Sequence, residues 1–218
     1  MNNESEGPNV QSQPMEITWL GHSCFKITWN SYSVVLDPYD PRPGLPSLHV
    51  QAHKVLTSHS HADHNYVQAV EMLPTMGECP FGITAFPSYH DKAQGADRGP
   101  NTIHRIEVGG LTVLHLGDLG HPLDCELREQ LRAIDALLVP VGGYYTIDAA
   151  EARDVCEQLR PRVVIPMHFK VAADQPIGPL EDFLDVMQGY EIQYYDGRTV
   201  HLTPDTPSHV AVLNRTFT

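Results

Sequence analysis

The sequence predicts an α/β protein in which two β-sheets pack face to face with helices on the outside. Short β-branched stretches dominate the first half of the chain, the pair Gly109-Gly110 separates two further strands, and helical and buried-strand patterns alternate in the second half. Strands, then a hairpin, then alternating helix and strand is the order expected of such a layered fold. The length of 218 residues suits one domain. We expect that domain over residues 15–218, after a polar, disordered lead over residues 1–14.

The expected elements follow from the periodicity of apolar residues and from the glycines and prolines between them. Strands are expected at residues 15–20, 23–29, 31–39, 53–59, 81–87, 135–141 and 162–168, with a hairpin over 103–118 and two or three closing strands between Tyr190 and Leu213. Helices are expected at residues 63–73, 123–134, 148–161 and 179–189, the third with Asp148 as its N-cap. The proline-rich stretch from Pro38 to Pro46 is expected to be a loop.

Composition narrows the classes of partner. The formal net charge is -13 and the chain has no basic run, so nucleic acid is not expected as a partner. No run of about 18 apolar residues is present, which argues against a membrane span. The N-terminal residues lack the apolar stretch of a signal peptide. The four cysteines form no C-x-x-C pair and indicate free thiols in a reducing compartment, so the cytoplasm is the expected location.

The chemistry of the chain is concentrated in the segment from His59 to His64, which holds three histidines and one aspartate. In an extended or turning segment His59 and His61 project to the same side and can share one metal ion. Asp63 and His64 then face a second ion nearby. Imidazole nitrogen and carboxylate oxygen suit Zn²⁺, and also Fe or Mn²⁺. The segment therefore predicts a site for two metal ions just beyond the end of a strand.

This segment, SHSHADH, resembles the H-x-H-x-D-H signature of the metallo-β-lactamase superfamily. Three further stretches, SYHD, HLGDLGH and IPMHFK, supply the expected downstream partners in the order of that superfamily, each after an apolar run. WLGHSCFKI and VPVGGYYTIDAAEA look like the branch that contains ascorbate-6-phosphate lactonase and related uncharacterised Zn-dependent hydrolases. The resemblance covers the chain from Met15 to its end.

The resemblance implies a four-layer αββα sandwich of two mixed β-sheets flanked by helices, and it implies a set of ligands. Metal one would be held by His59, His61 and His90, metal two by Asp63, His64 and His168, and Asp118 would bridge them. Zn²⁺ is the expected ion, with Mn²⁺ or Fe as alternatives. Relatives often assemble, so a homo-oligomer is a further expectation.

Other residues are weaker candidates. In the resembling branch, the histidine at the position of His22 lies near the metal site, and His121 follows Asp118 by three residues; each is a candidate for contact with substrate or for proton donation. Asp63 could also orient the attacking hydroxide. Possible contacts to an anionic substrate are Arg42, Arg98, Lys170 and the Tyr144-Tyr145 pair.

These residues predict a dinuclear metal-dependent hydrolase in which a hydroxide between the metals attacks a small ester, lactone or phosphodiester. No G-x-S-x-G segment offers a competing serine nucleophile. A di-iron oxidoreductase and a non-catalytic metal-binding protein on the same fold are the alternatives. The former would need a flavin domain or partner, and the latter is disfavoured by the complete ligand set. The loops that select a substrate do not identify it.

Overall fold

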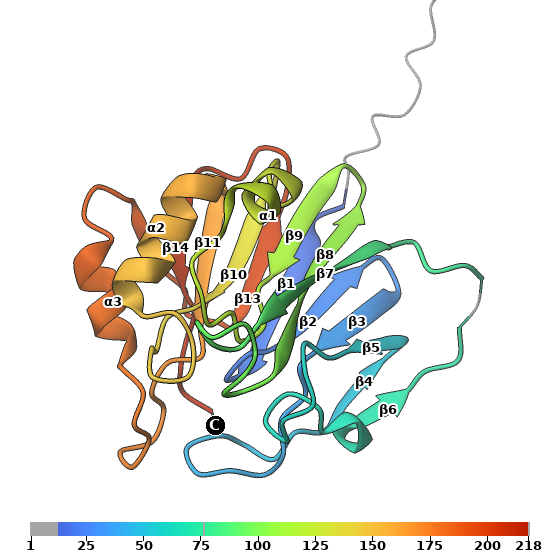
Figure 1. Ribbon diagram of the computed structural model, residues 1–218. Helices are drawn as coiled ribbons and strands as arrows, with labels where there is room; N and C mark the ends of the chain where they lie inside the picture. Colours follow the sequence, from blue (N-terminus) through green and yellow to red (C-terminus); the bar gives the residue numbers. More distant parts are fainter. Residues whose placement is uncertain (1–12, 76, 218) are drawn as a thin grey trace, which may run out of the picture.

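The computed structural model describes residues 13–75 and 77–217, which form two large β-sheets and a small third one (Figure 1). The five strands of the first sheet lie in the order β13 (Thr199–Leu202), β1 (Met15–Gly21), β2 (Cys24–Trp29), β3 (Tyr32–Leu36) and β5 (Lys54–Leu56). The seven strands of the second lie in the order β12 (Ile192–Tyr194), β14 (His209–Val212), β11 (Val163–Met167), β10 (Ala136–Pro140), β9 (Leu111–His115), β8 (Pro100–Val108) and β7 (Gly82–Tyr89). The third sheet pairs β4 (Val50–Ala52) with β6 (Val70–Met72). The predicted disordered lead lies outside the described residues except for its last two.

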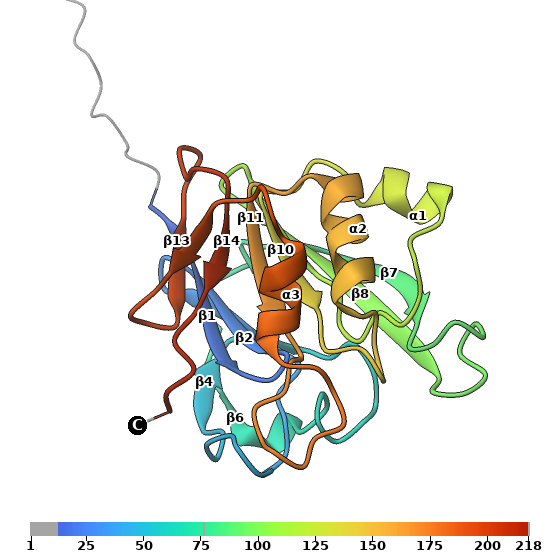
Figure 2. The ribbon, with the colours of Figure 1, turned by 90° about the vertical axis from the view of Figure 1, so that its left-hand side faces the viewer.

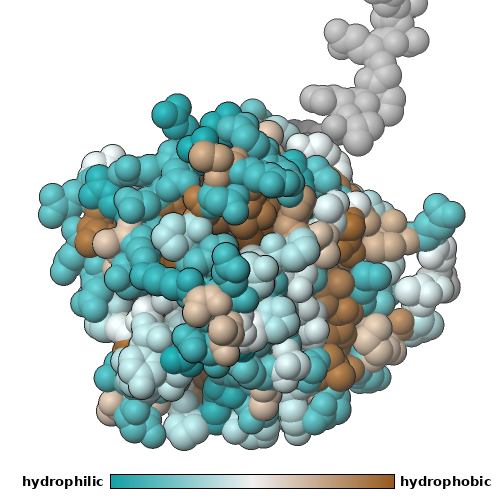
Figure 3. Space-filling model, in the orientation of Figure 1, coloured by the Kyte–Doolittle hydropathy of each residue, from teal (hydrophilic) through white to brown (hydrophobic). Residues whose placement is uncertain are grey.

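The core lies between the two large sheets. In β1 every second side chain is buried, and Ile17 and Trp19 join one apolar cluster with Leu114 of β9 and Leu138 of β10 from the other sheet. This alternation is what a strand with one buried face produces. Full burial of such side chains stabilises the fold by roughly 1.5–3 kcal/mol each. The face seen in Figure 3 is correspondingly mostly hydrophilic, with hydrophobic residues in a narrow strip and small patches.

Three helices cover the outer face of the seven-stranded sheet, as Figures 1 and 2 show. They are α1 (Cys125–Gln130), α2 (Ala149–Leu159) and α3 (Leu180–Val186). The strands β10 and β11 beneath them are buried along their whole length, as expected of parallel strands covered on both faces. No helix among the described residues is long and apolar enough to cross a membrane.

The expected sandwich of two sheets with outer helices is confirmed, but the helix expected at residues 63–73 is wrong. That segment contains only the short 3₁₀ turn η1 (Val67–Ala69), and it then runs into β6. Backbone bonds to distant carbonyls, from Tyr66 to Pro38 and from Leu73 to Ala52, replace the helical pattern. Strand pairing with distant parts of the chain has overridden the local preference for a helix. The β-branched side chains of Val67 and Val70 already weaken that preference. The outer face of the five-stranded sheet is consequently covered by β4, β6 and η1, through a small apolar cluster that includes Val35, Tyr39 and Val70.

The other expected elements are present with limits shifted by a few residues. The hairpin between β8 and β9 turns at Gly109-Gly110, where both residues have positive φ, as a two-residue hairpin turn requires. The helix expected at 123–134 is reduced to α1, whereas three closing strands are present as anticipated. The proline-rich stretch 38–46 has no regular element, in agreement with its sequence.

The strand directions bring polar residues to one edge of the molecule. Strands β9, β10 and β11 run parallel to one another, and β5 runs parallel to β3. Ligands of α/β sheets bind outside the carboxyl ends of the strands. Asp118 follows β9, His168 follows β11, and the His59 segment follows β5. Among the hydrogen bonds that connect segments of the two sheets here is the one from the backbone N–H of Thr102 in β8 to the carbonyl of Ser58.

Replacing Asp148 by alanine tests the capping box at the start of α2. Asp148 accepts a hydrogen bond from the Glu151 N–H, and the Glu151 carboxylate accepts one from the Asp148 N–H. Asp148→Ala is expected to lower the free energy of unfolding by about 1 kcal/mol. Urea denaturation of the metal-loaded protein measures this loss. The control, Asp185→Ala at an exposed site in α3, should change that free energy by less than about 0.5 kcal/mol; equal losses in the two variants would contradict the capping role.

Candidate metal centre

Two groups of potential metal ligands face each other at the edge where the strands end. One group contains His59, His61 and His90, and one nitrogen of each ring lies within 4.8 Å of the others. A second group, with the same closeness, contains His22, Asp63, His64 and His168. The structure therefore brings together the two sets expected from the sequence, and it adds His22 to the second.

Asp118 lies between the two groups. Its Oδ2 atom is 3.1 Å from His90 Nε2 in the first group. In the second group it is 3.1 Å from His64 Nε2 and 3.2 Å from His168 Nε2. The distance to His59 Nε2 is longer, at 3.9 Å. One carboxylate oxygen thus faces imidazoles of both groups, as a bridging ligand must. Burial raises the pKa of Asp118, but the imidazoles of His168 and His64 outweigh burial and hold that pKa well below its ordinary range.

Asp37 orients His64 of the second group, and this role was not predicted from the sequence. This completely buried carboxylate follows β3 and accepts hydrogen bonds from the Ser58 N–H at 2.6 Å and from the Ser58 hydroxyl at 2.5 Å. Its Oδ2 also lies 2.8 Å from His64 Nδ1. Burial raises the pKa of Asp37, yet the imidazoles of His115 and His64 outweigh burial and lower it to about 2. An ionised Asp37 holds the proton of His64 on Nδ1 and leaves Nε2 free to bind a metal.

Two other rings are oriented in the same way. His59 Nδ1 is 2.9 Å from the Ser58 hydroxyl oxygen, and His90 Nδ1 is 3.0 Å from the backbone carbonyl of Tyr145. A carbonyl oxygen accepts only, so His90 carries its proton on Nδ1 and presents a lone pair on Nε2. The sequence motif names the ligands, but only the fold reveals these partners.

The backbone around the centre is locally strained. His22 and His168 both have left-handed conformations, with φ of 51° and 53°, and the His168 N–H bonds to the His22 carbonyl at 3.4 Å. Residues other than glycine rarely adopt such angles outside functional sites. Gly120 is required for a different reason, because a Cβ atom there would come within 2.3 Å of the His90 backbone. The two segments can approach closely only without that side chain.

The polar atoms in the centre fit a divalent cation. Six of the nine buried side-chain atoms without a hydrogen-bond partner among the described residues belong to the centre: His22 Nδ1 and Nε2, His59 Nε2, His64 Nε2, His168 Nδ1 and Asp118 Oδ1. Such atoms are costly unless a partner satisfies them, and most of them lie in the two ligand groups and Asp118. Burial, aided by His168, lowers the pKa of His22 to about 4, and burial, aided by His64, lowers that of His59 to about 3. Both rings are therefore neutral, which is the form that binds metals.

The acidic groups in the centre also require positive charge. Burial lowers the pKa of His64, but the carboxylates of Asp118 and Asp37 outweigh it and raise that pKa well above its usual value. These two carboxylates therefore favour positive charge at the position of His64. A bound metal would supply this charge directly, so the charges and the unpaired atoms both match a metal site.

Two small cavities open on the centre, with Tyr145 lining both. The first, of about 260 Å³, lies beside the second ligand group and is lined by His22, Arg42, Asp63, Tyr145, His168, Gln175, Pro176 and Ile177. The second, of about 240 Å³, lies beside His90 and is lined also by Arg98, Tyr144 and Thr146. Four of the residues that the sequence suggested for contact with an anionic substrate, Arg42, Arg98, Tyr144 and Tyr145, line these cavities.

The basic side chains beside these cavities differ in whether they are already paired with carboxylates. Arg42 Nη1 donates to Asp63 at 3.0 Å, and Arg42 also pairs with Asp40. Arg98 instead lies over the Tyr145 ring, 4.4 Å from its centroid, and has no carboxylate partner within the described residues. Lys170 lines neither cavity. Arg98 is therefore the cation best placed to meet an anionic group of a ligand.

The structure does not bring His121 to the metal centre. Its Nε2 accepts a hydrogen bond from the Tyr89 N–H at 3.2 Å, and its Nδ1 lies 2.8 Å from the Pro122 carbonyl. It lines a separate hollow beside α1, away from both ligand groups. His121 is close to Asp118 in the sequence, but its side chain is not close to the metal centre.

Comparison with known proteins identifies the family. The model of the beta-lactamase superfamily domain matches residues 16–168, a segment that contains every residue of the two ligand groups. The chain belongs to this superfamily. The proteins of the superfamily that it resembles include metal-dependent hydrolases, and the chain is a metal-dependent hydrolase of this class.

The relatives cover most of the chain. A UPF0173 metal-dependent hydrolase of Carboxydothermus hydrogenoformans is 29% identical to this chain, and the match covers 77% of this chain and 91% of the relative. A UPF0173 metal-dependent hydrolase of Archaeoglobus fulgidus is 30% identical, and that match covers 71% of this chain and 83% of the relative. A solved structure from Thermotoga maritima, assigned to the Zn-dependent hydrolases of the metallo-beta-lactamase superfamily, is 33% identical, with a TM-score of 0.68 over 91% of this chain and 98% of its own.

Removing the carboxylate of Asp37 tests its positioning role. Asp37→Ala is expected to weaken zinc binding by about 10- to 100-fold, because His64 loses the acceptor that fixes its tautomer. Competition with a chromophoric chelator measures the affinity. Asp37→Asn, which keeps an acceptor oxygen, should lie between Asp37→Ala and the original protein. The control Asp154→Asn, on the exposed side of α2, should bind zinc normally; unchanged affinity in Asp37→Ala would contradict the assignment.

Proposed function

We propose that this metal-dependent hydrolase holds two divalent ions, expected to be Zn²⁺, and acts on a small anionic ester, lactone or phosphodiester. The observation that carries this proposal is the position of Asp118, whose single carboxylate oxygen faces imidazoles of both ligand groups. A centre for one ion would need only one of these groups. The donor set of imidazoles and carboxylates suits Zn²⁺, while Mn²⁺ and Fe are the alternatives.

The ligands divide between the two ions as the groups divide in space. His59, His61 and His90 would hold the first ion, and Asp63, His64 and His168 the second, with Asp118 shared. His22 would join the second group as a further ligand, because both of its ring nitrogens are buried without a partner and Nε2 lies 3.5 Å from Asp63 Oδ2. A ligand role for His22 replaces the roles in proton donation or substrate contact considered from the sequence.

Bound there, two ions would lower the pKa of a shared water molecule towards neutrality and polarise the bond to be cleaved. The protein would then need no nucleophile of its own. No serine or cysteine of the described residues lines either cavity, and the hydroxyl of Thr146, which lines the second, donates to the Ile147 carbonyl at 3.0 Å. Asp63 has a second role in this arrangement. Its Oδ2 accepts from Arg42, which fixes the carboxylate between the ligand group and the first cavity.

The cavities support a small and negatively charged substrate. Each has a volume of about 240–260 Å³, below the usual range for drug-sized ligands, and the two are separated by Tyr145. Carboxylates line both cavities, Asp63 the first and Asp91, Asp148 and Glu151 the second, but Arg98 in the second has no carboxylate partner for its guanidinium among the described residues and could receive an anionic group. The net charge of -13 disfavours the binding of long polyanions. A small anionic substrate in this site would experience less of that repulsion.

Metal analysis of a single variant tests the proposed centre. The protein loaded with zinc should contain two ions per chain. His61→Ala should lose most of the bound metal and all measurable hydrolysis, because the first group is reduced to two imidazoles. Elemental analysis and assays against lactones, phosphodiesters and acyl amides provide the measurements. His121→Ala is the matched control and should keep both ions; a His61→Ala variant with two ions and full activity would refute the assignment.

Arg98→Gln tests the choice of an anionic substrate. With any substrate found in that screen, we expect KM to rise about tenfold while kcat changes less, since the arginine contributes mainly to binding. The effect should vanish for a neutral substrate analogue. Arg215→Gln, which removes an exposed arginine paired with Glu181, is the control. An equal rise in KM for neutral and anionic substrates would show that Arg98 supports the loop rather than the ligand charge.

A further inference from the structure

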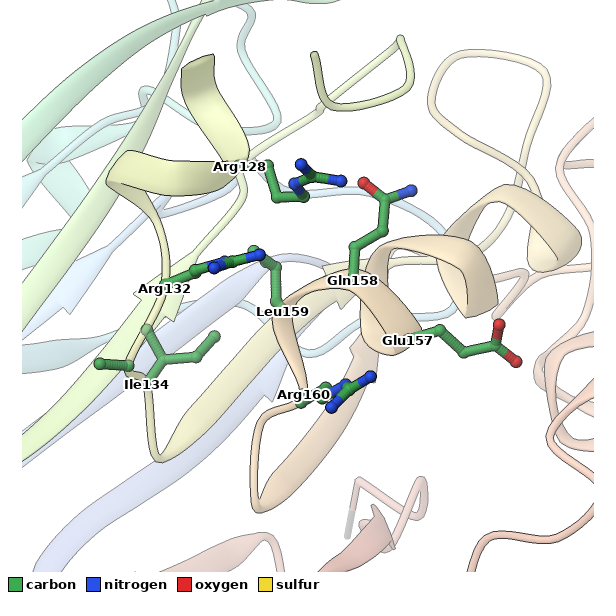
Figure 4. A pocket seen from close by; sticks show the side chains of 8 residues that line it. Arg128, Arg132, Ile134, Glu157, Gln158, Leu159 and Arg160 are labelled. Carbon is green, nitrogen blue, oxygen red and sulfur yellow. The ribbon is translucent and has the colours of Figure 1, made fainter. Parts of the chain in front are cut away.

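A further cavity lies beside the N-terminal ends of β10 and β11, whereas the metal centre lies beyond the C-terminal ends of the strands. Its volume is about 610 Å³, and it is lined by Arg128, Arg132, Ala133, Ile134, Glu157, Gln158, Leu159 and Arg160 (Figure 4). These residues come from α1, from the C-terminal end of α2 and from the loop that enters β10 at Ala136. The metal ligands follow the opposite ends of the strands, and the 11 residues of α2 alone span about 16 Å. The cavity is therefore separate from the catalytic cavities.

The charge of this cavity contrasts with that of the protein. Three of the 14 basic residues line it, in a chain whose net charge is -13. The only acidic residue in the lining is Glu157, which already pairs with Arg153 at 2.8 Å. In Figure 4, Glu157 points away from Arg128 and Arg132. The hollow is thus a local positive site on an acidic molecule, and such a site attracts small anions.

The arginines have donors that the described residues do not satisfy. Arg128 Nε is buried and has no hydrogen-bond partner. Arg160 makes no side-chain hydrogen bond or ion pair within the described part of the chain, and its backbone has a left-handed conformation with φ of 51°. Glu129 is the one carboxylate that pairs with the other two arginines among the described residues, with Arg132 at 3.2 Å and with Arg128 Nη2 at 3.7 Å. A buried donor without a partner is costly, so an acceptor from a ligand would be stabilising.

Two of these arginines lie at the C-terminal ends of helices, Arg128 in the last turn of α1 and Arg160 at the C-cap of α2, where their charge favours the helix dipole. Hydrogen bonds to the last helical carbonyls, the other common use of a basic residue there, do not occupy their side chains. At this edge the carbonyls of Arg132 and Ala133 receive their bonds from a different residue, Arg105, at 2.9 and 3.3 Å. Neither Arg128 nor Arg160 donates to a carbonyl among the described residues.

The floor of the cavity is held in place before any ligand binds. Arg105 fixes the backbone at residues 132 and 133. Asp135, at the end of the same loop, accepts two bonds from Arg162 at 2.7 and 3.0 Å and one from the Thr112 N–H at 2.8 Å. Rigid positioning of donors reduces the entropy that binding must overcome. The loop therefore resembles a prepared binding site more than a flexible surface.

We propose that this arginine cavity binds the phosphate group of a small phosphorylated metabolite. Arg128 and Gln158 extend towards one another from α1 and α2, and Arg132 extends from the loop beneath them (Figure 4). Guanidinium groups match phosphate oxygens with paired donors. No aromatic residue lines the cavity, so no stacking surface for a nucleobase is present in it, while Ile134 and Leu159 offer an apolar floor for a short carbon chain. The proposal does not depend on the assignment of the metal centre.

Isothermal titration of the metal-loaded protein with inorganic phosphate and with glycerol 3-phosphate tests this site. The double variant Arg128→Gln/Arg160→Gln should weaken phosphate binding at this cavity by at least about tenfold, since each lost arginine removes a charge-assisted bond. Phosphate bound at the metals is followed separately, as competitive inhibition of hydrolysis, and should be unchanged. Tighter binding of glycerol 3-phosphate than of inorganic phosphate would identify a phosphate ester as the ligand, and the reverse order would identify free phosphate.

The control is Arg215→Gln, which removes one positive charge far from this cavity and should leave every titration unchanged. Metal content and thermal unfolding of the double variant show whether it is folded. Equal phosphate binding in the double variant and the original protein would overturn the proposal. The proposal would also be overturned if the original protein, titrated with millimolar phosphate, showed no phosphate binding in addition to the binding at the metals that is detected as inhibition.

Discussion

The buried charge of Asp118 is the constraint on which the centre depends. A carboxylate removed from water stays ionised only when positive charge or donors surround it. Here the imidazoles of His64, His90 and His168 meet its Oδ2 atom from different segments of the chain. Asp37, a second buried carboxylate, lies on the other side of the His64 ring and contacts its Nδ1 atom. The two sheets must therefore meet at this edge in one register, because a slip in either would leave a buried charge without a partner.

Much of the centre could be predicted because its ligands are close in sequence or follow strand ends. The HxHxDH segment placed His59, His61, Asp63 and His64 beyond a strand, and the structure brings them together as expected. Apolar runs marked β9 and β11, so the residues after them could be assigned to the same edge. Asp37 lies near the end of the strand predicted at residues 31–39, just before Pro38, and in the structure it directly follows β3, so its position at a strand end was the available signal. Its role was missed because a lone aspartate before proline is also typical of a turn.

The remaining differences arise where tertiary contacts decide the outcome. The helix expected at 63–73 gives way to η1 and β6 because β4 supplies a partner strand that the sequence does not announce. His22 joins the second ligand group although it lies 41 residues before Asp63 in the chain, whereas His121, much nearer to Asp118, bonds to Tyr89 and Pro122 instead. Spacing along a chain predicts contact only within one element. Across elements, the turn geometry at Gly21-His22 and the packing at Gly120 determine which imidazole points inward.

The distribution of the ligands along the chain has a consequence for biosynthesis. The two groups draw on positions from His22 to His168, and each group takes residues from segments that follow different strands. A growing polypeptide therefore lacks the complete set until His168 has left the ribosome. The early histidines, from His59 to His64, are made long before Asp118 and can meet it only after β9 is in place. A metal held by all the residues of either group can therefore be fully coordinated only after the strands that position them have formed, and the second group is complete only once β11 is in place.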